Sequence, residues 1–257
     1  MITVDDHRPS GLRLLTVPLL VALGLLAFWL YLRLTPGRLL DSEVLTPAFV
    51  SSRTLRHLEL VAISFSLAAL IGLAGGIALS RRGRFAEAAA FLPANLGQAV
   101  PSVGVLALVS LVAGLGVVTT VVALTAFGIL PVLRNTVSAL KQVDPAVIDA
   151  ARGAGMTDRQ SMWRVRLPLA SLGIFAGLRT SLVLIVGTAT LGNFVGGGGL
   201  GDVINAGLGN LSAHVILTGA VLVAAMAVTL DWLLGIVERL MTPRSLHPTE
   251  SAVGENG

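Results

Sequence analysis

The sequence predicts an all-α polytopic membrane protein, and three observations support this fold class. Hydrophobic residues make up 54% of the chain and charged residues only 12%, about half the charged share of an ordinary soluble domain. The mean hydropathy of +0.85 indicates that lipid covers much of the surface. The apolar residues also form continuous runs that suit membrane-spanning helices, whereas a membrane barrel needs short alternating segments.

Six apolar runs predict about six transmembrane helices. The runs cover residues 14–32, 58–79, 88–112, 117–140, 169–191 and 211–236. The third run contains Pro93 and Pro101 and is expected to be kinked or broken, and the fourth carries Pro131. No cleavable signal peptide is expected, because the first run is long and no small-residue cleavage site follows it.

Lysine and arginine residues set the predicted orientation. With the N-terminus inside, 13 of them fall in cytoplasmic segments and 4 in outer segments, so both termini are predicted to be cytoplasmic. The calculated pI of 10.9 therefore reflects topology, and no nucleic-acid partner is expected. The absence of cysteine excludes disulfides and thiolate metal sites.

The polar segments divide the chain into three predicted regions. Residues 1–57 are expected to form an N-terminal transmembrane helix and an outer linker with a short helix. Residues 58–240 form a transmembrane domain, and 241–257 a disordered cytoplasmic tail. Within the central region, the cytoplasmic segment 141–168 is polar and helix-prone and suits a docking surface. The outer connection 192–209 contains four consecutive glycines.

The cytoplasmic segment carries the most informative motif. It reads Asp149-Ala150-Ala151-Arg152-Gly153-Ala154-Gly155, then nine residues, then Val165-Arg166-Leu167-Pro168. The two alanines permit close approach by another surface, and Gly155 can take a positive φ at a helix end. Pro168 fits the first turn of a new helix, where its missing N–H costs nothing. The motif predicts a helix, a glycine turn and a second helix that leads into the fifth span.

This motif resembles the signature of ABC importer permeases, which reads E-A-A, three residues, G, nine residues and I-x-L-P. Asp149 replaces the usual Glu and Val165 the usual Ile. Other blocks resemble the osmoprotectant branch of that family, which imports glycine betaine, choline, carnitine, proline betaine and related amines. These blocks are Gln98-Ala99-Val100-Pro101-Ser102, Leu130-Pro131-Val132-Leu133-Arg134-Asn135-Thr136, Val143-Asp144-Pro145 and the stretch from Gly196 to Asp202. The resemblance covers about residues 55–236.

The resemblance implies a type I ABC importer permease core whose cytoplasmic loop couples to a separate ATPase subunit. The implied coupling residues are Asp149, Ala150, Ala151, Gly155, Leu167 and Pro168. A second permease subunit (the same chain or a related one) and an extracytoplasmic solute-binding protein would complete the transporter in the bacterial cytoplasmic (inner) membrane.

No catalytic residue, metal site or cofactor is expected in this chain. A Walker A loop needs a Gly-Lys pair, and the only lysine, Lys141, follows Leu140. ATP would therefore be bound by the partner ATPase.

Candidates for the translocation path or its gates come from the same blocks and from one cation within a span. They are Gln98, Pro101, Ser102, Asn135, Thr136, Arg179, Gly197, Gly198, Gly199 and Asp202. Arg179 lies about 16 Å beyond Pro168 along a helix, and is expected either to line the path or to pair within the bundle, with backbone carbonyls as candidate partners. Asp231 is expected to be an interface anchor. The glycine run is expected to supply backbone flexibility, either beside an outer gate or as a simple turn.

Two alternatives stay open. Permeases for another small solute, such as methionine, share the loop and a similar glycine run. The string Gly199-Leu200-Gly201-Asp202 matches the G-x-G-D of intramembrane aspartyl proteases, in which two carboxylates activate water. Their partner Tyr-Asp motif is missing, because the only tyrosine, Tyr31, precedes a leucine.

Overall fold

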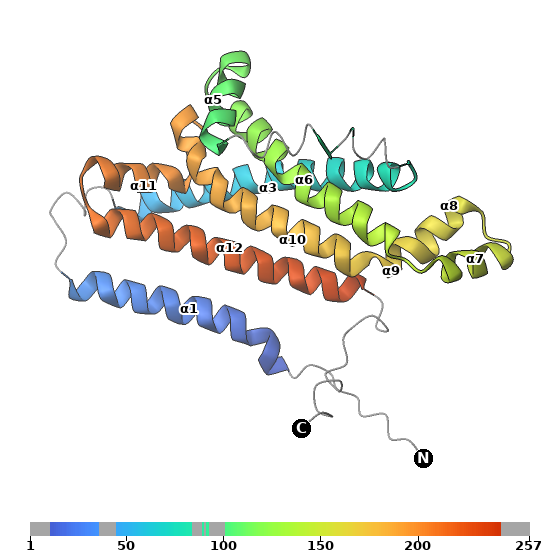
Figure 1. The fold of residues 1–257 in the computed structure, drawn as a ribbon. Coiled ribbons are helices and arrows are strands. Elements are labelled where there is room, and N and C mark those ends of the chain that lie inside the picture. Colours follow the sequence, from blue (N-terminus) through green and yellow to red (C-terminus); the bar gives the residue numbers. More distant parts are fainter. Residues whose placement is uncertain (1–10, 36–44, 84–88, 90, 93–100, 243–257) are drawn as a thin grey trace, which may run out of the picture.

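A computed structural model describes residues 11–35, 45–83, 89, 91–92 and 101–242. These residues form helices and short connections, and none of them lies in a strand (Figure 1). The helices are α1 (Gly11–Leu34), α3 (Pro47–Ser80), α5 (Ser102–Ala113), α6 (Val117–Lys141), α7 (Pro145–Gly153), α8 (Asp158–Ser161), η1 (Met162–Arg166), α9 (Leu167–Leu169), α10 (Ser171–Thr188), η2 (Ala189–Val195), α11 (Leu200–Gly209) and α12 (Ala213–Met241). The η1 segment is a π-helix and η2 a 3-10 helix. The predicted all-α fold class is confirmed.

Within the described residues, five helices are long and apolar enough to cross a membrane. They are Leu15–Leu34, Pro47–Ser80, Val117–Lys141, Ser171–Val195 and Ala213–Met241. These five match five of the six predicted runs. Much of the third run, including Pro93, lies outside the described residues, as does the predicted tail from residue 243. The described end of that run is the shorter apolar helix α5, which begins directly after Pro101.

The helix α3 is longer than predicted. The sequence suggested an outer linker with a short helix and then a separate span, whereas one helix covers all of Pro47–Ser80. Thr46 caps its start by accepting a hydrogen bond from the Phe49 N–H at 3.3 Å. Polar side chains of the first turns bond within the helix, where the Ser52 and Thr54 hydroxyls each donate to a backbone carbonyl one turn earlier at 2.8 Å. Farther along, Arg56 pairs with Glu59 on the same helix face at 2.6 Å. The apolar pattern therefore located the lipid-covered part of the helix and missed its polar beginning.

The contact between α3 and α6 is the most extensive in the bundle, and small residues make it possible. Gly72 and Gly76 lie one turn apart on α3. A β-carbon on Gly72 would come within 2.7 Å of the Val132 Cβ, and one on Gly76 within 2.6 Å of the Thr136 Cβ. Membrane helices associate through such close backbone approach, because lipid provides little hydrophobic drive between them.

A neighbouring face of α6 packs against α10 in the same way. A β-carbon on Gly173 would come within 2.6 Å of the Ala139 Cβ, and one on Gly177 within 2.6 Å of the Asn135 Cβ. The helix α6 is therefore the centre of the bundle, and each of its two neighbours approaches it through a pair of glycines spaced four residues apart.

The bundle has two different ends (Figure 1). We call residues 141–170 the loop end; it holds α7, α8 and α9 and lies beside the last residues of α3 and α12. We call residues 192–212 the glycine end; it holds α11 and lies beside the first residues of α3 and α12. Basic residues gather at or near the loop end: Arg81, Arg82, Lys141, Arg152, Arg159, Arg164, Arg166 and Arg239, whereas Arg33, Arg53 and Arg56 lie toward the glycine end.

The helix α1 lies along α12 (Figure 1). Apart from Val17, its half-buried residues and Thr35 just after its end recur at alternating steps of three and four, as in a coiled-coil seam. This seam consists of Pro18, Val21, Leu25, Phe28, Leu32 and Thr35. Near the glycine end, Tyr31 stacks on His214 of α12 with ring centroids 5.8 Å apart. The other faces of α1 expose leucines such as Leu20 and Leu34, as expected for a helix surrounded by lipid.

Candidate functional site

The loop motif forms part of the short helix α7 at the loop end. Asp144 caps the start of this helix by accepting a hydrogen bond from the Ala146 N–H at 2.8 Å. Asp149 and Ala150 are exposed, whereas Ala151 is buried against its own chain. Of the two alanines expected to admit another surface, Ala150 is the one open to a partner. Ala151 instead allows α7 to lie close to the rest of the loop.

Gly155 ends α7 in the conformation that the sequence predicted, with a φ of 81°. Its N–H donates to the Arg152 carbonyl at 2.9 Å, and the Met156 N–H donates to the Ala151 carbonyl at 3.1 Å. These two bonds form a Schellman cap, in which glycine is the usual residue. No atom lies within 4 Å of the place a β-carbon would occupy, so backbone conformation, and not crowding, favours glycine here.

The chain then returns toward the bundle through consecutive helical turns. Thr157 and Gln160 form a capping box at the start of α8. The following π-helical turn η1 begins at Met162, whose side chain is fully buried. Leu167 and Pro168, both half-buried, lie in the first turn of α9, as predicted for the proline. Helical turns thus join α7 to α10. One of them, the π-helical turn η1, is of a kind that is often found at functional sites.

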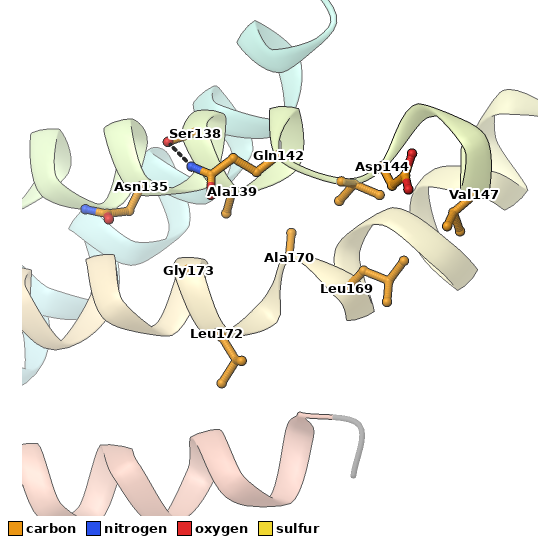
Figure 2. Close-up of a pocket in the computed structure, with 11 residues that line it drawn as sticks. Asn135, Ser138, Ala139, Gln142, Asp144, Val147, Leu169, Ala170, Leu172 and Gly173 are labelled. Carbon is orange, nitrogen blue, oxygen red and sulfur yellow. Dashed lines mark hydrogen bonds between the residues drawn. The ribbon is translucent and has the colours of Figure 1, made fainter. Parts of the chain in front are cut away.

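A cavity of about 450 Å³ lies between α6, α7 and the start of α10 (Figure 2). Figure 2 shows Asn135 and Ser138 on α6 and Gln142 directly after it at the edge of the cavity, where the Gln142 Nε2 donates to the Ser138 Oγ at 2.8 Å. The Asn135 amide also donates to the Pro131 carbonyl at 2.9 Å. Among the two predicted path residues of this block, Asn135 lines the cavity. Thr136 is fully buried and faces α3.

Arg179 pairs with two carboxylates of α12. Its Nε and Nη2 donate to the two oxygens of Asp231 at 2.8 and 2.6 Å, and its Nη1 lies 3.4 Å from a Glu238 oxygen. The backbone carbonyls suggested as its partners are not the groups it binds. Asp231, predicted as an interface anchor, is instead the main partner of Arg179. Pairing between charged side chains of neighbouring helices is the usual arrangement within a membrane.

Side chains of α3 hold the glycine run at the opposite end of the bundle. Gly196, Gly198 and Gly199 have φ values of 76°, 82° and 90°, which glycine adopts without a steric cost. The Gly197 carbonyl accepts a hydrogen bond from the Arg56 Nε at 3.3 Å. The run was expected to supply backbone flexibility, either beside an outer gate or as a simple turn, and both remain predictions; the structure adds that Arg56 of α3 binds it.

His57 is a fully buried residue at this end that the sequence analysis missed. Its Nδ1 accepts a hydrogen bond from the Leu200 N–H at 3.3 Å. Because Nδ1 is the acceptor, Nε2 carries the ring proton and donates to the Val186 carbonyl at 3.1 Å. One side chain of α3 therefore fixes both the end of the glycine run and α10. A single histidine within an apolar helix was the available signal.

Asp202 lies in the first turn of α11 and binds two other elements. Its carboxylate pairs with Arg53 of α3 at 2.8 Å and accepts a hydrogen bond from the Asn193 amide of η2 at 2.6 Å. Neither partner was predicted, because nothing in the sequence shows that α3 begins beside the glycine run. These contacts fasten the start of α11 to the rest of the glycine end.

The remaining predicted path residues do not join these groups in one site. Pro101 and Ser102 are at the start of α5, and Gln98 lies outside the described residues. Asn135 lines the cavity near the loop end, while Asp202 belongs to the glycine end. Among the residues that the structure describes, no three His, Asp or Glu side chains are placed to hold a metal ion.

These features define a polytopic helical membrane protein that presents an exposed helical loop at one end. Residues 67–243 match the family model of the binding-protein-dependent transport system inner membrane component. The chain belongs to this family and is an ABC importer permease subunit, as the loop motif indicated. The helix α1 precedes the matched region.

Several relatives of known role are similar to this chain. The carnitine transport permease protein OpuCD of Listeria monocytogenes is 36% identical over 210 residues, which cover 81% of this chain and 94% of the relative. The glycine betaine/carnitine/choline transport system permease protein OpuCB of Bacillus subtilis is 38% identical, covering 76% and 89%. The osmoprotectant import permease protein OsmW of Salmonella typhimurium is 32% identical, covering 77% and 94%.

Solved structures share the fold. A chain of the methionine ABC transporter MetNI in an inward-facing conformation superposes with a TM-score of 0.64 at 24% identity, covering 76% of this chain and 96% of that one. A chain of an amino acid ABC transporter solved with histidines gives a TM-score of 0.61 at 19% identity, covering 80% and 100%. The type I importer permease fold predicted from the loop motif is confirmed.

Proposed function

We propose that this chain is the permease subunit of an ATP-driven importer for quaternary-amine osmoprotectants, namely glycine betaine, choline, carnitine and proline betaine. The observation that carries this proposal is the similarity to permeases named for carnitine, for glycine betaine and choline, and for osmoprotectant import. Each match spans three quarters or more of this chain and most of the relative.

The loop end would dock to a separate ATPase subunit, which binds and hydrolyses the ATP. The support for this step is the exposed side of α7, where Asp149 and Ala150 face outward and no atom of the chain crowds Gly153 or Gly155. Leu167 and Pro168 lie in the helical connection that would pass the movement of α7 to α10. The second permease subunit would be another copy of this chain or a related one.

The loop end would face the cytoplasm, with both termini on that side of the bacterial inner membrane. The support is the concentration of arginine and lysine at the loop end, which the positive-inside rule places in the cytoplasm. An extracytoplasmic solute-binding protein would then deliver its cargo at the glycine end.

Uptake of radiolabelled glycine betaine at high osmolarity tests this function. Cells that lack other osmoprotectant transporters would express the whole operon with or without this subunit. We expect uptake that depends on the subunit and is reduced by unlabelled choline or carnitine. Betaine uptake that does not depend on the subunit, together with subunit-dependent uptake of radiolabelled methionine, would favour the methionine alternative, for which the solved relative supports the fold alone.

The protease alternative is disfavoured by the surroundings of Asp202. Its carboxylate binds the guanidinium of Arg53 and the amide of Asn193, whereas aspartyl catalysis brings two carboxylates to one water. Replacing Asp202 by Asn should leave receptor-dependent ATP hydrolysis by the assembled transporter measurable. A peptidase activity of the purified chain that this substitution abolished would reinstate the alternative.

A further inference from the structure

We propose that Arg179 is a positioning residue that moves between Asp231 and Glu238 during the transport cycle. The movement would let α10 shift along α12 while the cation always keeps a carboxylate partner. This inference rests on the proposed transport function and assigns a role to a charged cluster outside the loop. We call Arg179, Asp231, Gly235 and Glu238 the arginine track.

The two carboxylates share the guanidinium unequally. Asp231 receives two hydrogen bonds, at 2.8 and 2.6 Å, whereas Glu238 has a single contact at 3.4 Å. A guanidinium forms its best pair with one carboxylate through two parallel bonds. The acids are seven residues apart on α12, about 10 Å along a helix, so both cannot be bound in this way at once. Glu238 is therefore a second acceptor that is within reach but weakly used.

Two positions lie between the two acids on this face of α12: Leu234, whose side chain packs against the core, and Gly235, which has no side chain. Gly235 lies one turn beyond Asp231, toward Glu238. The Arg179 Nη1 and Cζ would lie 3.9 and 4.0 Å from a β-carbon at that position, and no other atom is as close. A guanidinium that moves from one acid to the other can therefore pass beside Gly235, where no side chain stands in its way. The Arg179 side chain is also 42% exposed, so surrounding side chains do not enclose it.

A cation in a membrane must keep a partner throughout any movement, because an unpaired charge in hydrocarbon is costly. One acceptor would fix α10 against α12, since a shift would leave both charges unpaired. Two acceptors in a row on α12 remove this obstacle. The arginine track thus provides two discrete arrangements of one interface, which is the physical requirement for a switching element.

The two helices of the arginine track differ in how they connect to the loop end. The helix α10 continues from the loop through η1 and α9, whereas α12 enters the bundle from the glycine end. A displacement of α7 by the ATPase would therefore be transmitted to α10 and not directly to α12. A movement of α10 that α12 does not share must be accommodated at the contact between these two helices. Arg179 forms an ion pair across this contact.

The test uses the complete transporter in lipid nanodiscs and proteoliposomes, with Glu238→Gln and Gly235→Ala variants. We expect Glu238→Gln to lower the maximal rate of ATP-driven uptake at least tenfold, with an unchanged KM for the loaded binding protein and an unchanged melting temperature. The methyl group of Gly235→Ala is compatible with the present position of Arg179, but it would hinder movement of the guanidinium toward Glu238. We therefore expect a several-fold lower rate of uptake. The controls are Glu59→Gln, in an exposed ion pair of α3, and Gly24→Ala, which meets open space on α1.

A distance measurement on the same complexes does not depend on the cargo. Because the chain has no cysteine, Val183→Cys and Val237→Cys place spin labels at exposed positions of α10 and α12. We expect vanadate trapping of the ATPase to change the distance between the labels, and Glu238→Gln to abolish this change. An unchanged distance, or wild-type uptake in the Glu238→Gln variant, would overturn the proposal. A distance change without any uptake of osmoprotectants would support the arginine track and contradict the proposed substrate.

Discussion

Ser181 on α10 donates a hydrogen bond to the backbone carbonyl of Gly128 on α6 at 2.8 Å. Three helices meet at this glycine. A β-carbon on Gly128 would come within 2.8 Å of the Ser181 Oγ and 2.9 Å of the Ala68 Cβ on α3, and it would also meet Ile185. Gly128 is therefore a point where α3 and α10 both lie close to α6.

Replacing Gly128 by Val should destabilise the folded bundle. The added side chain has no free space, and overpacking a well-packed core costs about 1–3 kcal/mol. Ser181→Ala should have a smaller effect of about 0.6 kcal/mol, the average for an interhelical hydrogen bond in a membrane protein. Thermal unfolding of the purified chain in detergent measures both. Gly24→Val, at an open position on α1, should match the wild type, and an equal loss in that variant would contradict the assignment.

Replacing Gly155 by Asp should abolish transport while membrane insertion stays normal. The left-handed φ of this residue costs roughly 1–2 kcal/mol for a residue other than glycine, and the added charge would lie on the exposed loop. Gly155→Asn should retain part of the activity, because asparagine tolerates this conformation better. The measurements are uptake and co-purification of the ATPase subunit. Gly83→Asp serves as the control, since Gly83 lies in open space without a positive φ. Normal uptake in Gly155→Asp would contradict the role of the loop.

Replacing His57 by Phe should weaken the glycine end. The substitution keeps a ring but removes the acceptor for the Leu200 N–H, and a buried donor left unpaired costs about 1–3 kcal/mol. We expect a lower melting temperature and faster proteolysis of the segment around residues 192–212. His214→Phe is the matched control, because its half-buried ring can still stack on Tyr31. Equal losses in the two variants would show that the hydrogen bonds of His57 are not what matters.

Single cysteines should report the orientation of the chain without background labelling, because the natural sequence has none. A membrane-impermeant maleimide should label Leu208→Cys, on the exposed side of α11, in intact spheroplasts. It should label Gly153→Cys, on α7, only after the membrane is disrupted. The reversed pattern would show that the loop end faces outward and would rule out docking to a cytoplasmic ATPase.

The sequence predicted the membrane helices well because lipid selects for long apolar runs regardless of which helices touch. It also predicted the conformation of Gly155, since a left-handed helix end depends on local backbone geometry. The short helix α11 was missed, because its ten residues follow a glycine run and are rich in glycine themselves, a composition typical of a loop. Local composition therefore predicts long membrane helices and single turns such as the one at Gly155, but not a short helix of loop-like composition such as α11.

The partners of Arg179 could not be predicted for a different reason. Its position within an apolar run showed that it needed a partner. Which partner depends on the register between α10 and α12, and close packing sets that register. The same limit applies to Thr136, which a sequence block placed beside Asn135 as a path residue but which lies against Gly76 of α3. Helical geometry points these two neighbours in different directions.

The contact between α1 and α12 has a consequence for the order in which the protein is made. These are the first and last helices of the described chain, so α1 is synthesised long before its partner exists. Until α12 is inserted, α1 lies in the bilayer without this partner, and its exposed leucines suit contact with lipid. Closure of the seam is then among the latest steps of assembly, because contacts distant in sequence form slowly. Premature release of the nascent chain before α12 would leave α1 inserted but without the helix it packs against.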